Sequence, residues 1–204
     1  MGCALATVLA ANGHRVTMWS IEADVVADIE KHHRTEKYLP GITLDAEYIT
    51  ATSDLVTACD GAQGVVIAVP STVIAKVATS AATYVSARVP VLSVAKGIAA
   101  ATFSTFPDVV AAALGRRRGT VAGLAGPAVA TELATGTPTA VIIAGPPIVT
   151  GFWKRAFQRK TFRVEESRDL VGVSWAAALK NVYAIALGMC DGMEYAMNTK
   201  ALLT

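Results

Sequence analysis

A lysine and an asparagine lie side by side within a stretch that is otherwise almost entirely apolar or small. Lys180 and Asn181 occupy the middle of residues 174–192, SWAAALKNVYAIALGMCDG. Burial or a neighbouring cation lowers the pKa of a lysine, which can then exchange a proton with an oxygen atom near neutral pH. The alternative is a core-helix lysine whose long side chain reaches water across an apolar surface. The residue types alone leave both interpretations open.

Two further segments carry groups suited to an anionic ligand. Lys96, in SVAKGI, follows the predicted strand at residues 89–94, and open α/β sheets place their ligands at that end of their strands. The alternative is a surface loop lysine. GPAVATE, residues 126–132, introduces a predicted helix whose first backbone amides can meet an anion. The alternative here is ordinary capping, with Pro127 at the first helical position.

The first residues have the pattern of a dinucleotide-binding unit that starts within its glycine turn. Residues 1–19, MGCALATVLAANGHRVTMW, predict a helix followed by a strand. Gly2 would be the third glycine of a GxGxxG turn, with the first strand and the first two glycines absent. Glu22 follows the strand, where such folds present an acid to the adenosine ribose. The alternatives are an N-cap glycine and a first-turn acid favoured by the helix dipole.

Short apolar runs rich in Val and Ile alternate with amphipathic stretches, which predicts parallel strands covered by helices. The predicted strands are residues 15–19, 64–69, 89–94, 120–125 and 139–144, and the predicted helices are residues 3–12, 22–33, 53–60, 71–86 and 104–115. This alternation indicates a Rossmann-like, doubly wound α/β sheet that lacks its first strand.

The alternation changes after about residue 146. A helix at residues 150–158, an extended piece at 161–166 and a long helix opening near Asp169 follow in order. We therefore expect an incomplete dinucleotide-binding domain at residues 1–166 and the beginning of an all-helical domain at residues 167–204.

Composition and charge argue against several classes of partner. The chain is 53% hydrophobic and 17% charged, with a net charge of +2 and basic residues scattered along it. The run Arg116, Arg117, Arg118 is interpreted as a solvated turn, so we expect no nucleic-acid partner. Lys180 and Asn181 interrupt the longest apolar run, at about residues 171–189, so we expect no membrane span.

The cysteines and the N-terminus predict a compartment. Cys3, Cys59 and Cys190 lack the spacing of a metal site or of a CxxC motif, so we expect no bound metal and a reducing environment. The N-terminus lacks the pattern of a secretory signal. Together these features favour a soluble, cytoplasmic protein.

Several segments taken together resemble the NAD(P)-dependent glycerol-3-phosphate dehydrogenases. They are, in order, YLPGITL, GVVIAVPS, SVAKGI, GPAVATELATGTPTAVIIA, FRVEESRDLVGVSWAAALKNVYAIALGMCDG and NTKA. The order and spacing match across essentially the whole chain, and the ALKN and AKG elements are the specific ones. The resemblance implies a hydride transfer between nicotinamide and the central carbon of dihydroxyacetone phosphate, which gives sn-glycerol 3-phosphate.

The resemblance also implies a role for each matching residue. Lys180 would exchange the proton, with Asn181 as a hydrogen-bonding neighbour, and Lys96 would contact both substrate and cofactor. The other implied substrate contacts are Gly126 and Ala128. The implied cofactor contacts are Ile21, Glu22, Tyr38 and Ala130, which join the predicted glycine Gly2.

The resemblance leaves choices of cofactor and activity. NAD or NADP would serve, with NAD favoured because Glu22 stands where many members have an arginine suited to a 2′-phosphate. A homodimer through the helical domain is implied. Glu194, Tyr195 and Met197 replace the usual glycine-rich approach to NTKA, and the family's phosphate-gripping residues would lie past residue 204. The alternatives are a lysine-dependent hydroxyacid or ketoacid reductase, and an inactive truncated fragment that acts as a binding or assembly module.

Overall fold

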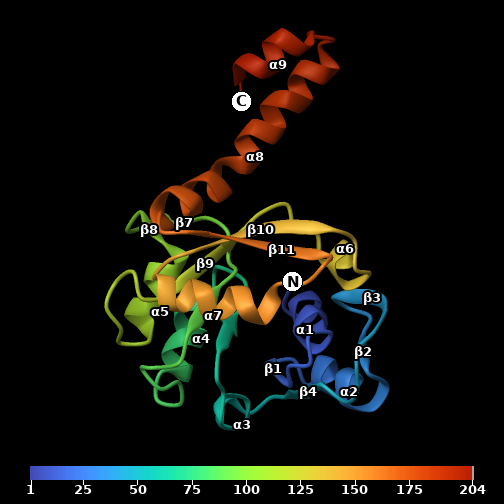
Figure 1. The fold of residues 1–204 in the computed structure, drawn as a ribbon, viewed down its shortest axis with the longest axis vertical. Helices are drawn as coiled ribbons and strands as arrows, with labels where there is room; N and C mark the ends of the chain where they lie inside the picture. Colours follow the sequence, from blue (N-terminus) through green and yellow to red (C-terminus); the bar gives the residue numbers. More distant parts are fainter. Residues whose placement is uncertain (204) are drawn as a thin grey trace.

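The computed structural model describes residues 1–203, and its centre is a five-stranded β-sheet with the strand order β11-β10-β9-β6-β5. β5 (Val65–Ile67), β6 (Val91–Ser93) and β9 (Ala122–Ala125) are parallel neighbours. β10 (Thr139–Ala144) runs antiparallel to β9 and parallel to β11 (Phe162–Ser167). The sheet lies below the long C-terminal helix in Figure 1. The predicted Rossmann-like α/β class is confirmed.

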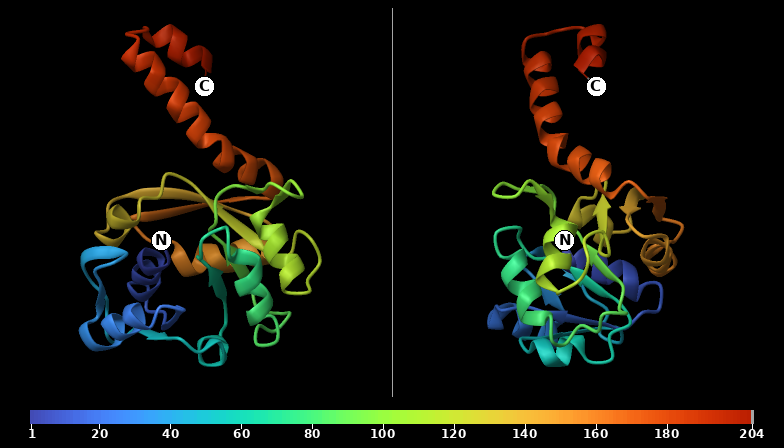
Figure 2. Two further views of the ribbon diagram at one scale, coloured as in Figure 1. Left: turned by 180° about the vertical axis from the view of Figure 1, so that it is seen from behind. Right: turned by 90° about the vertical axis from the view of Figure 1, so that its left-hand side faces the viewer.

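Helices lie on both faces of this sheet, as the two-sided burial of its strands requires. In Figure 2, α1 (Gly2–Ala10) and α7 (Pro147–Phe157) cover one face, and α4 (Ile74–Ala81) and α5 (Phe106–Ala113) cover the other. One core cluster joins Leu5 to Phe157, and a second joins Ile74 to Val110. The remaining helices are α2 (Ala23–His32), α3 (Leu55–Cys59), α6 (Ala130–Ala134), α8 (Leu170–Gly192) and α9 (Met197–Leu203).

One strand direction differs from the prediction. The expectation that residues 139–144 run parallel to residues 120–125 is wrong, because Ile143 pairs with Leu124 in antiparallel register. A parallel arrangement needs a crossover that returns the chain to the same end of the sheet, and this connection holds only α6, a helix of 5 residues. The extended piece at residues 161–166 is the strand β11, which pairs with β10 along its whole length.

β1 (Val16–Trp19) stands apart from the five-stranded sheet. It pairs in parallel with β4 (Ile49–Thr52), from Val16 opposite Ile49 to Trp19 opposite Thr52. Among the strands of residues 1–203, none connects this pair to the five-stranded sheet. The strands predicted to form a single sheet are therefore divided between two sheets. Two short antiparallel pairs complete the strands: β2 (Arg34–Thr35) with β3 (Leu39–Thr43), and β7 (Ile98–Ala99) with β8 (Ser104–Thr105).

The three-arginine run is exposed at Arg117 and Arg118, as a solvated turn requires, but it is also anchored to the rest of the protein. The Arg116 guanidinium donates hydrogen bonds to the carbonyl oxygens of Val89 and Ser86, at 2.8 and 2.6 Å. Arg118 Nε lies 2.8 Å from the Oδ2 atom of the buried Asp108. These charged donors tie the loop to the first turn of α5 and to the connection between α4 and β6.

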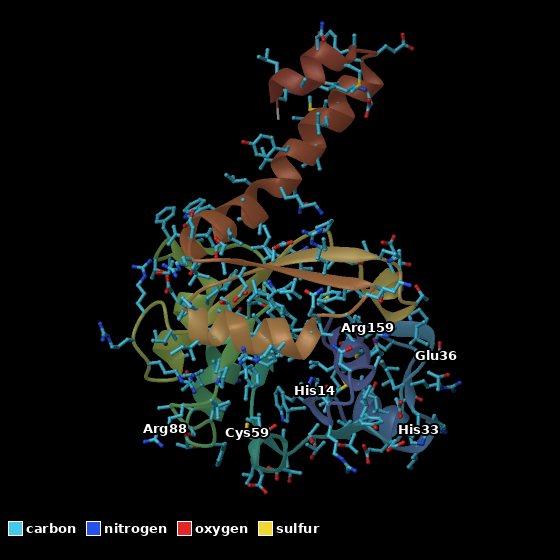
Figure 3. All side chains as sticks on the ribbon, viewed as in Figure 1. His14, His33, Glu36, Cys59, Arg88 and Arg159 are labelled. Carbon is cyan, nitrogen blue, oxygen red and sulfur yellow. The ribbon has the colours of Figure 1, made fainter. Side chains whose placement is uncertain are left out.

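Helix α8 begins on the sheet and then projects away from it together with α9 (Figures 1 and 2). It opens as predicted at Asp169, whose side chain accepts a hydrogen bond from Gly172 N–H at 2.7 Å. Figure 3 shows side chains standing out from α8 along its length, and Val182, Ile185 and Met189 are among the exposed apolar ones.

The apolar composition of α8 has a second implication. Among residues 1–203 it is the one helix long and apolar enough to cross a membrane, and 6% of its apolar window is buried. The core helix of a soluble protein meets the same criterion of length and composition, so the expected absence of a span stays a prediction. The domain boundary between residues 166 and 167 also stays a prediction.

The close packing of α7 against Gly64 predicts that one added methyl group at this position lowers the stability. We expect Gly64→Ala to lower the free energy of unfolding by about 1–3 kcal/mol, since overpacking forces side chains off their rotamers. A Cβ atom at Gly64 would lie 2.7 Å from Phe152 Cε1 and 2.8 Å from Trp153 Cη2. Urea denaturation followed by circular dichroism measures the change.

Gly188→Ala is the matched control for this substitution. Its added Cβ meets nothing within 4 Å, and alanine favours a helix over glycine by about 1 kcal/mol. We expect the control to keep or raise the stability. Equal stability of Gly64→Ala and the parent chain would contradict the packing.

Candidate active site

The carboxyl ends of two neighbouring parallel strands bring the predicted substrate residues to one edge of the sheet. Lys96 follows β6, and Gly126 follows β9, the strand that is paired in parallel with it. Lys96 Nζ donates a hydrogen bond to the Gly126 carbonyl oxygen at 3.4 Å. Segments separated by 30 residues therefore meet where the sequence predicts a ligand edge.

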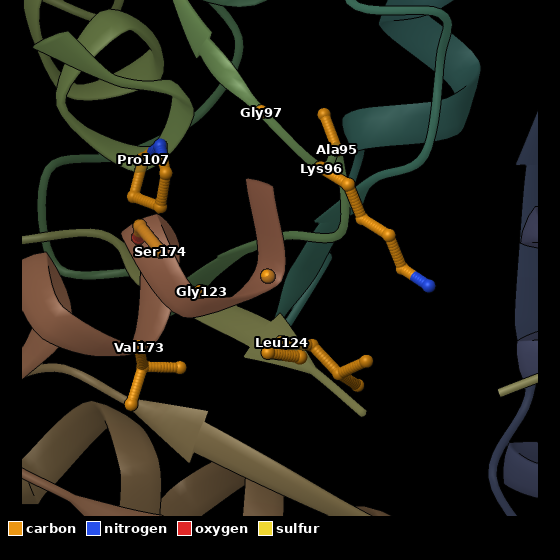
Figure 4. Close-up of a pocket in the computed structure, with 10 residues that line it drawn as sticks. Ala95, Lys96, Gly97, Pro107, Gly123, Leu124, Val173 and Ser174 are labelled. Carbon is orange, nitrogen blue, oxygen red and sulfur yellow. The ribbon is translucent and has the colours of Figure 1, made fainter. Parts of the chain in front are cut away.

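The first turns of α8 close one side of this edge. A pocket there is lined by the Lys96 loop, by β9 and by Val173, Ser174 and Ala177 of α8 (Figure 4). Gly123 permits the close approach, because a Cβ atom at this position would lie 3.2 Å from Leu170 Cδ1. In Figure 4 the Lys96 side chain points away from Val173 and Ser174 of α8.

Lys180 lies one turn beyond Ala177 on the same helix, and its positive charge affects the protonation of Lys96. The pKa of Lys96 is lowered, first by burial and then by the positive charge of Lys180. Among the ion pairs of residues 1–203, none involves either of these two lysines. Two cations without a carboxylate partner suit an anionic ligand such as a phosphate.

Lys180 is not buried in this structure, although it lies within an apolar stretch. Its side chain is exposed, as are those of Leu179 and Asn181 on either side. The physical reason is the projection of α8, since only its N-terminal turns contact the sheet (Figure 1). Lys180 nevertheless lies close enough to this edge for its positive charge to contribute to the lowered pKa of Lys96.

The Gly126 segment is a turn, and the helix expected at Pro127 begins later. The Ala128 N–H donates to the Gly126 carbonyl oxygen at 2.9 Å, and α6 starts at Ala130. Gly126 has a φ of +147°, and a Cβ atom there would lie 3.0 Å from the Ala140 carbonyl oxygen. Both the backbone conformation and the available space therefore require glycine.

The predicted cofactor residues Gly2 and Ala130 approach the same region of the core. A Cβ atom on Gly2 would lie 3.3 Å from Ala68 Cβ, just after β5. This close approach of helix and strand is what the third glycine of a dinucleotide turn provides. α1 packs beside α6, and Ala130 rests on the core cluster that includes Leu5.

Glu22 and Tyr38, which lie 16 residues apart, belong to a second cluster of polar side chains. The Tyr38 hydroxyl donates to Glu22 Oε2, and the Lys37 ammonium contacts Glu22 Oε1. The pKa of Glu22 is lowered, first by the hydrogen bond from Lys37 and then by that from Tyr38. Ile21 is 80% exposed beside this group. Sequence reasoning missed Lys37, whose only signal is its position next to Tyr38.

The fold and this site define a class: a Rossmann-like α/β protein with the features of a dinucleotide-binding enzyme at the carboxyl ends of its strands. The family model described as NAD-dependent glycerol-3-phosphate dehydrogenase N-terminus matches residues 1–148, and the model of the C-terminus of the same enzymes matches residues 169–204. The chain belongs to the NAD-dependent glycerol-3-phosphate dehydrogenase family.

Individual relatives carry the same name. Proteins named glycerol-3-phosphate dehydrogenase (NAD(P)+) from Anaeromyxobacter sp. strain K and from Myxococcus xanthus are each 40% identical over 99% of this chain. A crystal structure of glycerol-3-phosphate dehydrogenase from Coxiella burnetii, 33% identical, superimposes with a TM-score of 0.85 over 99% of this chain and 61% of its own. This chain spans 61% of the length of both sequence relatives.

The influence of Lys180 on Lys96 can be measured directly. We expect Lys180→Met to raise the pKa of Lys96, because the substitution removes a positive charge that disfavours a second one. Titration of the lysine Nζ resonances by nuclear magnetic resonance reports this pKa. Lys76→Met, on the exposed side of α4, is the matched control and should leave it unchanged. An unchanged Lys96 pKa in Lys180→Met would show that the charge of Lys180 does not act on Lys96.

Proposed function

We propose that this chain carries the hydride-transfer site of a glycerol-3-phosphate dehydrogenase, which interconverts dihydroxyacetone phosphate and sn-glycerol 3-phosphate. The observation that carries the proposal is the approach of Lys96 and Lys180 at the carboxyl edge of the sheet, beside the Gly126 turn. A phosphorylated ketone brings a dianion, which matches two cations that form no ion pair within residues 1–203. Membership of the family supports the same reaction.

Each residue at this edge has a proposed role. Lys180 donates a proton to the carbonyl oxygen during reduction and takes it back from the hydroxyl during oxidation. Lys96 binds the substrate and holds the Gly126 turn through its hydrogen bond to the carbonyl oxygen. Gly126 and Ala128 form the wall of the substrate site. The nicotinamide, when bound, supplies or accepts the hydride at the central carbon.

The cofactor site is proposed at the residues that fit a dinucleotide. Gly2 lacks the Cβ that would fill the approach between α1 and the end of β5. Glu22, at the N-cap of α2, would accept hydrogen bonds from the adenosine ribose. NAD is favoured over NADP because a carboxylate repels a 2′-phosphate. Ile21, Tyr38, Lys96 and Ala130 complete the proposed cofactor contacts.

The expectations about assembly and location enter the same proposal. We propose a homodimeric enzyme in the cytoplasm, with small-molecule substrates, without a nucleic-acid partner and without a membrane span. The bacterial relatives that share its family name support the cytoplasmic location.

Removing the Lys180 ammonium tests the proposed reaction. We expect Lys180→Met to lower kcat/KM for dihydroxyacetone phosphate by about 100- to 10,000-fold, the usual contribution of a positioned acid or base. Oxidation of NADH is followed by absorbance. Because this chain spans 61% of its relatives, the assay uses the chain itself and a chimera that adds the parts of the Anaeromyxobacter protein outside the match.

The matched control in both backgrounds is Lys76→Met, which removes an equal charge from the exposed side of α4. It should leave kcat/KM within about twofold, since surface charges on exposed sites act weakly. A chimera that reduces dihydroxyacetone phosphate equally well with and without Lys180 would exclude the proton role. A folded chimera without any turnover would exclude the proposed activity.

A further inference from the structure

Glu22 is held from two sides by neighbouring residues of the connection between β2 and β3. The Lys37 ammonium contacts one carboxylate oxygen, and the Tyr38 hydroxyl contacts the other. Lys37 Nζ also lies 5.5 Å from the centre of the Tyr38 ring, a cation–π distance. The carboxylate therefore has a fixed direction, imposed by groups 15 and 16 residues along the chain.

The charges of Glu22 and Lys37 have opposite effects on the binding of NADP, which carries a 2′-phosphate that NAD lacks. A carboxylate accepts hydrogen bonds from ribose hydroxyls and repels a phosphate, whereas an ammonium attracts a phosphate. In this structure the ammonium is already engaged by Glu22, with Asp24 Oδ2 as a second acidic neighbour at 3.9 Å. The preference for a nucleotide with or without a 2′-phosphate thus depends on whether Lys37 contacts Glu22 or the phosphate.

We propose that Lys37 is a second specificity-determining residue of the adenosine site, and that its ion pair with Glu22 keeps it from binding a 2′-phosphate. This inference rests on the proposed function, which places the adenosine ribose at Glu22. Loss of the Glu22 charge releases Lys37 toward the phosphate, so the acceptance of NADP needs the lysine as well as the absence of the acid.

The exposure of the pair makes such an exchange of partners feasible. The Lys37 and Glu22 side chains are 49% and 30% exposed. Exposed ion pairs are weak and are screened by salt, so a phosphate dianion competes with a single carboxylate for the ammonium. Tyr38 stays beside both residues and limits where the released lysine can move.

Two small nucleotides test the inference without any hydride transfer. Adenosine 5′-monophosphate and adenosine 2′,5′-bisphosphate differ only in the 2′-phosphate, and calorimetry at low salt gives both dissociation constants. We expect Glu22→Gln to shift the preference toward the bisphosphate by about tenfold, the size of one charge-assisted hydrogen bond. Lys37→Met in the Glu22→Gln background should abolish this shift, and Lys37→Arg in that background should keep it.

The controls separate this inference from the proposed reaction. Lys31→Met removes an exposed lysine from the last turn of α2 and should leave the preference unchanged. A shift that survives in the Glu22→Gln, Lys37→Met chain would overturn the role of Lys37, and so would failure of the parent chain to bind either nucleotide. The predicted pattern in a chain that does not reduce dihydroxyacetone phosphate would still support the inference, since neither nucleotide carries a nicotinamide.

Discussion

The approach of two lysine ammonium groups at one edge of a sheet is the constraint on which the rest of the site depends. Like charges repel, and burial adds a further cost at Lys96, whose pKa is lowered by both effects. The parallel strands β6 and β9 fix Lys96 beside the Gly126 turn. The close packing of α8 at Gly123 fixes the direction in which Lys180 is carried. A bound dianion would relieve the repulsion that this geometry creates.

The two polar groups of the site have opposite electrostatic character. The edge near Lys96 and Lys180 is cationic and forms no ion pair within the described residues 1–203. At the end of β1, the negative charge of Glu22 is balanced by Lys37. An unbalanced cationic group favours a charged substrate, whereas a balanced pair discriminates between ligands that differ by one phosphate. The proposed substrate site and the proposed cofactor site therefore differ in their electrostatic character.

Much of this arrangement follows from local sequence patterns. The remainder depends on contacts between distant residues, which such patterns do not encode. The sequence predicts the start of α8 at Asp169 and the close packing at Gly2, because capping and glycine sterics act within a few residues. It does not predict the antiparallel β10, since apolar runs carry no direction. It also misses the pairing of Lys37 with Glu22, which depends on how the β2–β3 connection folds back.

Lys180 is exposed to solvent, which bears directly on its proposed chemistry. An apolar stretch around a lysine suggests that burial tunes the amine, yet the apolar side chains of α8 are themselves largely exposed. The positive charge of Lys180 contributes, after burial, to the lowered pKa of Lys96. In the proposed reaction the ligand would contribute the missing desolvation, because a substrate seated against both lysines would displace water from them and strengthen every electrostatic contact in the site. The proposed proton transfer would thus depend on the occupied site, with the helix setting the position of the amine.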